Sequence, residues 1–388
     1  MRRLLLLLCI TIISTSYAVA SDTYVREPSV LPTDPILEAT GGGSVAMPRG
    51  TRGIRLNPAD FTGPFRLTVA AGAGGLAIDP ELLDRGVSRL LDGRLMPLPR
   101  NFAELYADRF SADGFGFSGS GDVAFTGSGL GLGISSDVEI FMRTGPDSDD
   151  ASGHLISETA LVGGIAIPFT IGDFDFSAGG AIRPTMRIRG ELNDRQAIDA
   201  FAAGTPFDEA FADTPVLNGF GLAMDAGLLA RKGNITFGAA VRDIGDTEFV
   251  YHEHSLEQVL DSIPDGTLPS GGGDREGELF DPETTYITPM STRLGVAWSR
   301  GEGFFRPSVS ADIHDPHLFL SRERSIYEHF SAGAELDIGR VLIARAGISA
   351  DGYGLGTGLR LGPIRVDSSV RFGSDTPPRA SLGARLEF

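Results

Sequence analysis

The last ten residues of the chain, from Arg379 to Phe388, restrict its fold more than any other stretch. In an extended strand, side chains alternate between two faces. One face of this stretch would be apolar, with Ala380, Leu382, Ala384, Leu386 and Phe388. The other face would carry Ser381, Gly383, Arg385 and Glu387. A tilted strand of about 9–11 residues crosses a bilayer, so the pattern predicts a strand of a transmembrane barrel. An amphipathic strand on a soluble core would show the same pattern, and the rest of the chain has to separate the two.

The terminal residue itself carries a second indication. An aromatic residue, Phe388, ends the predicted strand. This ending resembles the C-terminal assembly signal of bacterial outer-membrane β-barrels. The resemblance implies that the barrel assembly machinery is a partner and that outer-membrane lipid surrounds the strands. Because Phe388 falls on the apolar face of the predicted strand, we expect it to face that lipid.

The N-terminus reads as an export signal. Arg2 and Arg3 precede an apolar run from Leu4 to Ile13, and Ala18-Val19-Ala20 forms an A-x-A cleavage site. We therefore expect residues 1–20 to be a signal peptide and the mature chain to begin at Ser21. The only cysteine, Cys9, would be removed with the leader, so no disulfide framework is expected.

Charge and hydropathy argue against two classes of protein, those that bind nucleic acid and those that cross a membrane with helices. The net charge of −18 becomes −20 when the two leader arginines are removed, which argues against nucleic acid as a partner. After the leader, no apolar run is long enough for a membrane-spanning helix. The mature chain is then either soluble or a barrel, and its alternating segments with many glycines favour the barrel.

Alternation predicts an all-β fold, a transmembrane antiparallel β-barrel of about fourteen strands formed by residues 64–388. The expected strands are 64–77, 114–126, 128–144, 154–170, 173–190, 216–231, 234–250, 285–300, 303–314, 326–338, 340–350, 353–362, 364–373 and 379–388. Gaps after even-numbered strands are short, whereas those after odd-numbered strands are mostly long. Outer-membrane barrels show this asymmetry, with the long loops outside the cell.

The same alternation sorts the charged side chains of the strands. An arginine or lysine on the lipid face costs about 2–4 kcal/mol at mid-membrane and an acidic residue somewhat less, so we expect the charges on the lumen side. Seven acidic residues fall there: Asp137, Glu139, Asp225, Asp312, Glu335, Asp367 and Glu387. Seven arginines balance them: Arg183, Arg187, Arg242, Arg293, Arg345, Arg371 and Arg385. Such a balance suits a filled lumen in which arginines pair with carboxylates and hold a plug.

Four histidines close to predicted strand ends are the main candidates for chemistry. His252 and His254 follow one strand, and His314 and His317 follow another one strand further along. Imidazoles with Asp315 offer zinc-type ligands or a general base. No further residues complete such a site and no G-x-S-x-G elbow is present, so we expect no catalytic residues, no metal and no cofactor.

The N-terminal stretch 21–63 lacks alternation and cannot cross lipid, because its backbone would lack hydrogen-bond partners there. It forms either a periplasmic leader or a plug inside the barrel. Its motif Asn57-Pro58-Ala59, with Phe61 close behind, resembles the hatch of FadL-type long-chain fatty-acid transporters. Stretches 223–229, 240–247, 343–348 and 354–359 are similar to the broader group that includes PorV-type barrels. The resemblance implies a fourteen-stranded barrel with an N-terminal hatch.

Two functions follow from that resemblance. The first is outer-membrane transport of hydrophobic molecules, such as long-chain fatty acids, with Asn57, Pro58, Ala59 and Phe61 anchoring the hatch. The second is a structural or secretion-partner barrel of the PorV type, without transport. An apolar pocket between the hatch and the strands would favour the first, and a lumen packed solid would favour the second.

Overall fold

The structure is a computed structural model. It describes residues 24–27, 32–48, 50–76, 115–144, 151–202, 205–262, 285–317, 326–373 and 378–388. The expected signal peptide, the loop 78–113 and most of the acidic loop after residue 262 lie outside the described residues.

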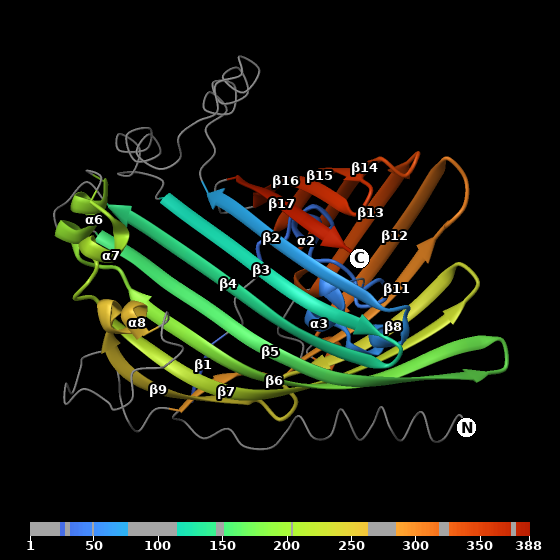
Figure 1. The fold of residues 1–388 in the computed structure, drawn as a ribbon, viewed down its shortest axis with the longest axis horizontal. Helices are drawn as coiled ribbons and strands as arrows, with labels where there is room; N and C mark the ends of the chain where they lie inside the picture. The colour runs from blue at the N-terminus through green and yellow to red at the C-terminus, as the bar shows by residue number, and fades with distance from the viewer. Residues whose placement is uncertain are drawn as a thin grey trace, which may run out of the picture.

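A closed antiparallel barrel of fourteen membrane crossings forms the body of the molecule (Figure 1). Most crossings are single strands: β2 (Arg66–Leu76), β3 (Phe115–Gly127), β4 (Leu130–Thr144), β5 (Ala151–Ile171), β6 (Phe174–Glu191), β7 (Pro215–Lys232), β12 (Phe305–His314), β13 (Phe330–Ile338), β14 (Leu342–Ser349), β15 (Gly352–Leu361), β16 (Ile364–Gly373) and β17 (Arg379–Glu387). The last strand pairs with the first, β17 with β2, which closes the wall. The predicted fold class and strand pattern are confirmed.

Two crossings are broken, and here the prediction of continuous strands at 234–250 and 285–300 is wrong. The first is split into β8 (Ile235–Arg242) and β9 (Thr247–Ser255), and the second into β10 (Thr285–Thr288) and β11 (Ser291–Ser299). The first break occurs because Asp243, Gly245 and Asp246 all have positive φ, which a regular strand does not tolerate. The β8 half pairs with β11, and the β9 half pairs with β10.

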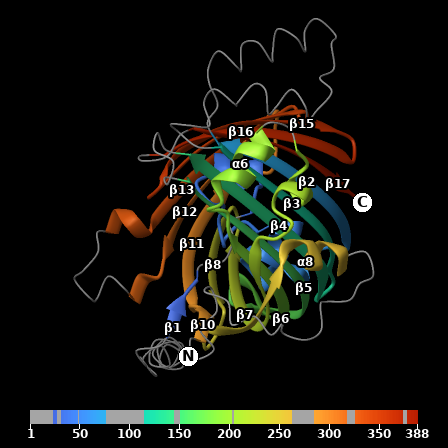
Figure 2. The same cartoon turned by 90° about the vertical axis from the view of Figure 1, so that its left-hand side faces the viewer.

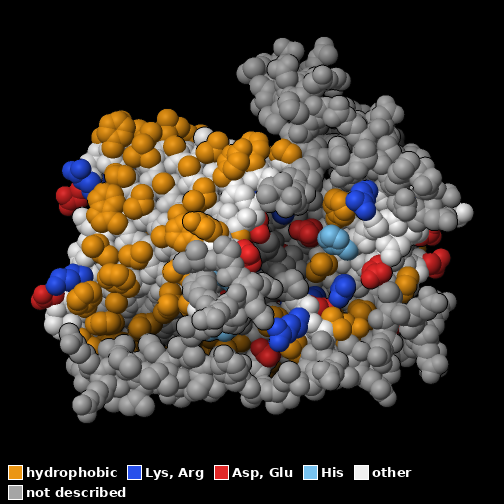
Figure 3. Space-filling view, turned by 180° about the vertical axis from the view of Figure 1, so that it is seen from behind, with side chains coloured by type: hydrophobic (Ala, Val, Ile, Leu, Met, Phe, Trp, Pro, Cys, Tyr) orange, Lys and Arg blue, Asp and Glu red, His pale blue; other side chains and the backbone are white. Residues whose placement is uncertain are grey.

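The outer surface of the wall is an apolar belt. Large apolar side chains of the strands are exposed there, including Phe220, Leu222, Met224, Phe237 and Val309. Figure 3 shows part of this belt as a broad area of hydrophobic side chains. Phe388 is exposed beyond β17, where its backbone exchanges hydrogen bonds with Leu67. A belt of this kind, on a closed barrel, places the protein in a bacterial outer membrane.

Among the helices of the described residues, none is long and apolar enough to cross a membrane. Three short helices, α6 (Arg195–Ala202), α7 (Phe207–Ala210) and α8 (Leu256–Ser262), gather at one end of the barrel (Figure 1), and Figure 2 shows α6 and α8 from that end. They bury a small apolar cluster that includes Ile198, Phe211 and Val259 against the ends of neighbouring strands. A 3-10 helix, η4 (Ile326–His329), occupies the start of a stretch predicted as strand and leads into β13.

Residues 32–63 lie inside the barrel, where Figure 1 shows α2 (Pro35–Ala39) and α3 (Thr51–Leu56) in blue. A short strand, β1 (Tyr24–Arg26), pairs in parallel with β10. The plug, defined here as residues 32–63, contains α2, α3 and η2 (Pro58–Thr62). Between them these elements contact strands around most of the wall. Asp34 begins α2 by accepting a hydrogen bond from the Ile36 amide at 2.8 Å, and Pro35 takes the first helical position.

Candidate functional site

Asn57 is the polar centre of the plug. Its side-chain oxygen accepts a hydrogen bond from the Ala59 amide at 3.0 Å and so caps η2. Its side-chain nitrogen donates to the Val45 carbonyl at 2.9 Å and, over longer distances, to the carbonyls of Leu228 and Ala239 in the wall. Because Asn57 is fully buried, a single amide joins two turns of the plug to β7 and β8.

The wall is shaped to receive this motif. A Cβ on Gly227 would lie 1.9 Å from the Asn57 side-chain oxygen, and one on Gly179 would lie 2.5 Å from the Pro58 carbonyl oxygen. The hydroxyl of Ser177 donates to the Ala59 carbonyl. Only glycine at these two wall positions allows so close an approach.

Phe61 fixes the plug on the apolar side. Its side chain is completely buried with Ile54 and Val162 among its neighbours. The ring lies against the backbone of Gly131 and Gly164, where a Cβ would come within 2.5 and 2.8 Å of ring carbons. The hatch residues predicted from sequence therefore all lie at the contact between plug and wall.

Charges bind the plug to a different part of the wall. Arg55 forms ion pairs of 2.6 Å with Asp122 of β3 and Asp137 of β4. Burial alone would lower the pKa of Arg55, but the charges of Asp122 and Asp137 and their hydrogen bonds outweigh it, so that pKa lies above its ordinary value.

A second charged contact crosses the seam between β17 and β2. Asp34 pairs with Arg385 of β17 at 3.2 Å, and the Thr33 carbonyl accepts a hydrogen bond from Ser120 of β3. Burial alone would raise the pKa of Asp34. The charges of Arg385 and Arg52 and the hydrogen bond from the Ile36 amide outweigh burial, so this pKa lies below its ordinary value. Burial and the nearby Arg385 lower the pKa of Arg52 to about 10. The carboxylate of Asp34 therefore stands between two arginines.

The fourteen charges predicted for the lumen are placed as follows. Arg183 bonds to Asp225 and to Asp243, Arg187 to Glu158 and Glu27, and Arg345 to Glu335 and Asp367. Asp312 accepts from the Val45 amide, and Glu139 contacts His154 and Arg379. Near the ends of the barrel, Arg371 pairs with Asp351, and Glu387 lies 3.9 Å from Arg385. Arg242 lies 3.9 Å from Asp225, and Arg293 donates to the Gly42 carbonyl at 3.4 Å.

Sequence reasoning did not identify several charged residues of this lumen network. Glu158 and Asp122 lie on strands whose alternation points them inward, so the signal was present. Glu27 precedes the plug, and it accepts hydrogen bonds from Arg187, Arg189 and Tyr251. No periodicity marks Glu27, because it lies outside the wall strands.

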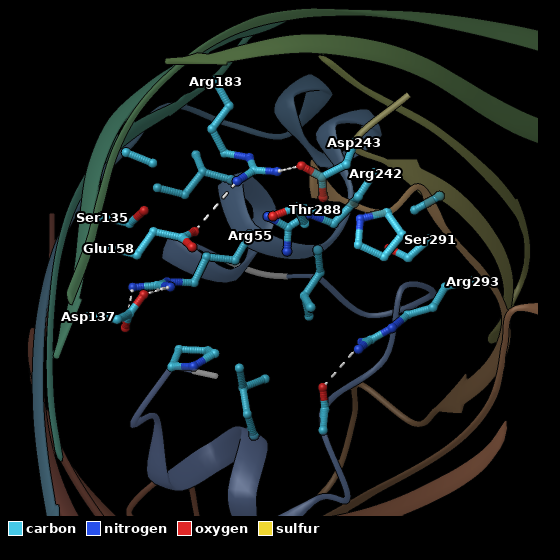
Figure 4. A pocket seen from close by; sticks show the side chains of 18 of the residues that line it. Arg55, Ser135, Asp137, Glu158, Arg183, Arg242, Asp243, Thr288, Ser291 and Arg293 are labelled. Atoms are coloured by element: carbon cyan, nitrogen blue, oxygen red, sulfur yellow. Dashed lines mark hydrogen bonds and ion pairs between the residues drawn. The ribbon is translucent and has the colours of Figure 1, made fainter. Parts of the chain in front are cut away.

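A cavity of about 360 Å³ lies between the plug and the wall (Figure 4). The plug contributes the apolar side chains Leu37, Ile54 and Leu56 together with the charged Glu38 and Arg55. The wall contributes mainly polar and charged ones, among them Ser135, Asp137, Glu158, Arg183, Arg242, Asp243, Thr288, Ser291 and Arg293. Since Asp243 and Thr288 border the two strand breaks, the irregular part of the wall also lines this cavity.

The four histidines do not assemble into a site. His252 is exposed and His254 buried on β9, whereas His314 ends β12 with its ring 3.2 Å from the Ser331 hydroxyl. His317 follows in the next turn. Within the described ranges, no three His, Cys, Asp or Glu side chains converge as metal ligands would.

The fold and the site together define a class of protein: an outer-membrane β-barrel that carries its own N-terminal plug in the lumen. Two solved structures share this fold. The CymD monoaromatic hydrocarbon channel is 11% identical with a TM-score of 0.50, and the match covers 93% of this chain and 99% of that one. The Ralstonia pickettii toluene transporter TbuX is 11% identical with a TM-score of 0.50, over 92% and 99%.

At this identity the likeness concerns the fold. The chain has the FadL-type fold that the Asn57-Pro58-Ala59 motif implied, and that prediction is confirmed. No protein-family model matches the chain, and no curated protein sequence matches it.

Proposed function

We propose that this protein conducts hydrophobic small molecules, long-chain fatty acids or hydrophobes of similar character, across the outer membrane. Ligand enters from the outer end, occupies the cavity between plug and wall, and passes when the plug shifts. No catalytic step and no cofactor are part of this proposal.

The cavity is the observation that carries the proposal. Three of its apolar side chains, Leu37, Ile54 and Leu56, belong to the plug rather than to the wall. Any movement of α2 or α3 therefore changes the shape of the cavity. A cavity that plug and wall enclose together suits a gated passage better than a purely structural barrel.

The way in which the plug is held supports the same proposal. Side-chain hydrogen bonds and ion pairs, among them those of Asn57, Arg55 and Asp34, attach the plug to the wall, whereas the wall is closed by its own backbone ladder. The plug can therefore loosen without opening the barrel. Buried polar contacts of this kind are costly to break one at a time, which makes the closed state well defined.

The double variant Asn57→Ala with Pro58→Gly tests the gating role. It should change the uptake of a radiolabelled long-chain fatty acid and of toluene by cells that carry the protein, while Asn193→Ala, at an exposed loop position, should not. Heat-modifiable migration in gels would verify that each barrel is assembled. Unchanged uptake by an assembled double variant would remove the gating role.

The unmutated protein provides the test of transport itself. If it raises uptake of no hydrophobic substrate above that of cells lacking it, transport is refuted. The PorV-type function, a structural or secretion-partner barrel, would then account for the fold.

A further inference from the structure

A line of four side chains runs from the outer mouth of the barrel to the plug. It begins at His154 near the start of β5, where the chain enters the barrel from one of the connections expected outside the cell. The His154 side chain is 41% exposed, and its Nε2 atom lies 3.2 Å from a carboxylate oxygen of Glu139 on β4. Its ring stacks on that of Phe141, with the two centroids 5.7 Å apart. The first member of the line is therefore both held in place and accessible to solvent.

Arg379 continues the line from Glu139 to the plug. Its guanidinium lies 3.6 Å from the second carboxylate oxygen of Glu139 and 3.2 Å from a carboxylate oxygen of Glu38 in α2. It also donates a hydrogen bond of 3.0 Å to the hydroxyl of Thr33. Arg379, a residue of the wall, thus holds α2 and the segment just before it.

Glu38 ends the line inside the plug. It is buried, and its second carboxylate oxygen accepts hydrogen bonds from Ser369 at 2.9 Å and from Ser381 at 2.5 Å. Glu38 also lines the cavity between plug and wall. A change in how Arg379 binds Glu38 therefore reaches the cavity.

The charge on His154 decides how Arg379 is shared between its two carboxylates. When the imidazole is neutral, Glu139 and Glu38 compete for one guanidinium. When the imidazole is protonated, Glu139 gains a cation of its own, and the positive ring repels Arg379 toward Glu38. Both effects strengthen the contact between Arg379 and the plug.

Five other charged side chains lie beside the line, on the lumen faces of the neighbouring strands. They are Asp137 and Arg143 on β4, Arg189 and Glu191 on β6, and Arg371 on β16. Their partners are Arg55 for Asp137, Glu27 for Arg189, Asn193 for Glu191 and Asp351 for Arg371. These pairs do not include His154, so a substitution of His154 leaves them in place.

We propose that His154 senses the pH outside the cell and sets how firmly Arg379 holds the plug. The plug is held more tightly when His154 is charged, at acidic pH, and more loosely when it is neutral. This inference rests on the proposed function and adds regulation to it, because external pH then controls how readily the plug shifts.

Hydrogen exchange of the purified full-length barrel in detergent tests the proposal at about pH 5.5 and about pH 8, on either side of the ordinary histidine pKa of about 6.5. At the acidic pH, peptides that cover α2 should exchange roughly 1.5- to 5-fold more slowly in the unmutated protein than in His154→Gln, the factor that a partly exposed ion pair supplies. At the alkaline pH the two proteins should exchange alike. Comparison at one pH removes the pH dependence of the intrinsic exchange rate and of the other lumen acids.

Two further variants separate the charge of His154 from its shape. His154→Arg carries a fixed charge, so its α2 peptides should exchange more slowly than those of the unmutated protein at about pH 8, by the same factor. His252→Gln is the matched control, because His252 is an exposed histidine on β9, and it should match the unmutated protein at both pH values. Heat-modifiable migration in gels would verify that each barrel is assembled.

The proposal is overturned if His154→Gln exchanges like the unmutated protein at the acidic pH, if their difference persists at the alkaline pH, or if His154→Arg gives no slowing there. The measurement needs no substrate, so its failure is distinguishable from failure of transport. A protein that takes up hydrophobes but whose α2 exchange ignores His154 would keep the proposed function and lose this regulation.

Discussion

Replacing Asn57 by alanine should free the plug while the barrel stays closed. The change removes the cap on the Ala59 amide, which is worth about 0.5–2 kcal/mol. It also removes the donor to the buried Val45 carbonyl, and a buried group left without a partner costs about 1–3 kcal/mol. The longer contacts to Leu228 and Ala239 add little, because they lie at 3.4 and 3.3 Å.

Together these terms give a loss of about 1.5–5 kcal/mol in the free energy that holds the plug. Such a loss raises the population of the released plug by roughly 10-fold to 4,000-fold. Local opening controls amide exchange in folded proteins, so exchange of the plug amides should accelerate by the same factor.

Hydrogen exchange followed by mass spectrometry, on protein in detergent, measures this directly. Peptides from residues 50–63 should gain deuterium far faster in Asn57→Ala, while peptides from β15 and β16 should be unchanged. Asn193→Ala serves as the control, since it leaves the plug intact. If the plug peptides of Asn57→Ala exchange at the unmutated rate, Asn57 is not what holds the plug and this reasoning is refuted.

Three further predictions concern the contacts of Phe61 and Asp34 in the plug and the terminal residue Phe388. Phe61→Ala should lower the free energy that holds the plug by about 3–5 kcal/mol, because it empties the space against Gly131 and Gly164. The same hydrogen-exchange measurement checks this, and unchanged protection of the plug amides would contradict it. The Asp34 carboxylate has a lowered pKa, so its contribution to plug docking is complete above the ordinary value of 3.8 and is lost as pH falls through the lowered one. Asp34→Asn should therefore exchange faster than the unmutated plug at neutral pH and equally fast well below 3.8, and a difference that persists at low pH would count against the ion pair with Arg385. Deleting Phe388 should reduce the heat-modifiable, membrane-inserted fraction without reducing export, as fractionation of cells would show; full insertion of the truncated chain would exclude its role in assembly.

The wall strands could be predicted from sequence because a barrel strand turns one row of side chains toward lipid and the other toward the lumen. Leu222 and Met224 face lipid and Asp225 faces the lumen, so alternation carries direct information about position. The two broken crossings were not predictable in this way. The break at 243–246 depends on the backbone angles of Asp243 and Asp246, and aspartate occupies such angles only in particular surroundings.

The plug was less accessible to sequence reasoning than the wall. The Asn57-Pro58-Ala59 motif identified its end, but α2 and α3 are too short to show a helical period. Which wall charge each plug residue would meet depends on where the plug sits in three dimensions. Arg55 reaching Asp137 across 82 residues, or Glu27 reaching Arg187 across 160, leaves no trace in local pattern.

The seam between β17 and β2 joins the two ends of the wall, so it has the largest sequence separation of any strand pair. Chain entropy therefore opposes this pairing more than any other. The plug residues Thr33 and Asp34 lie across that seam, with Thr33 against Gly72 of β2 and Asp34 bound to Arg385 of β17. We therefore expect this segment, which precedes β2 in the chain, to act as an internal template that brings β17 to its partner. We expect a chain lacking residues 33–40 to close its barrel more slowly, and time-resolved gel migration during refolding would contradict this if both chains closed at the same rate.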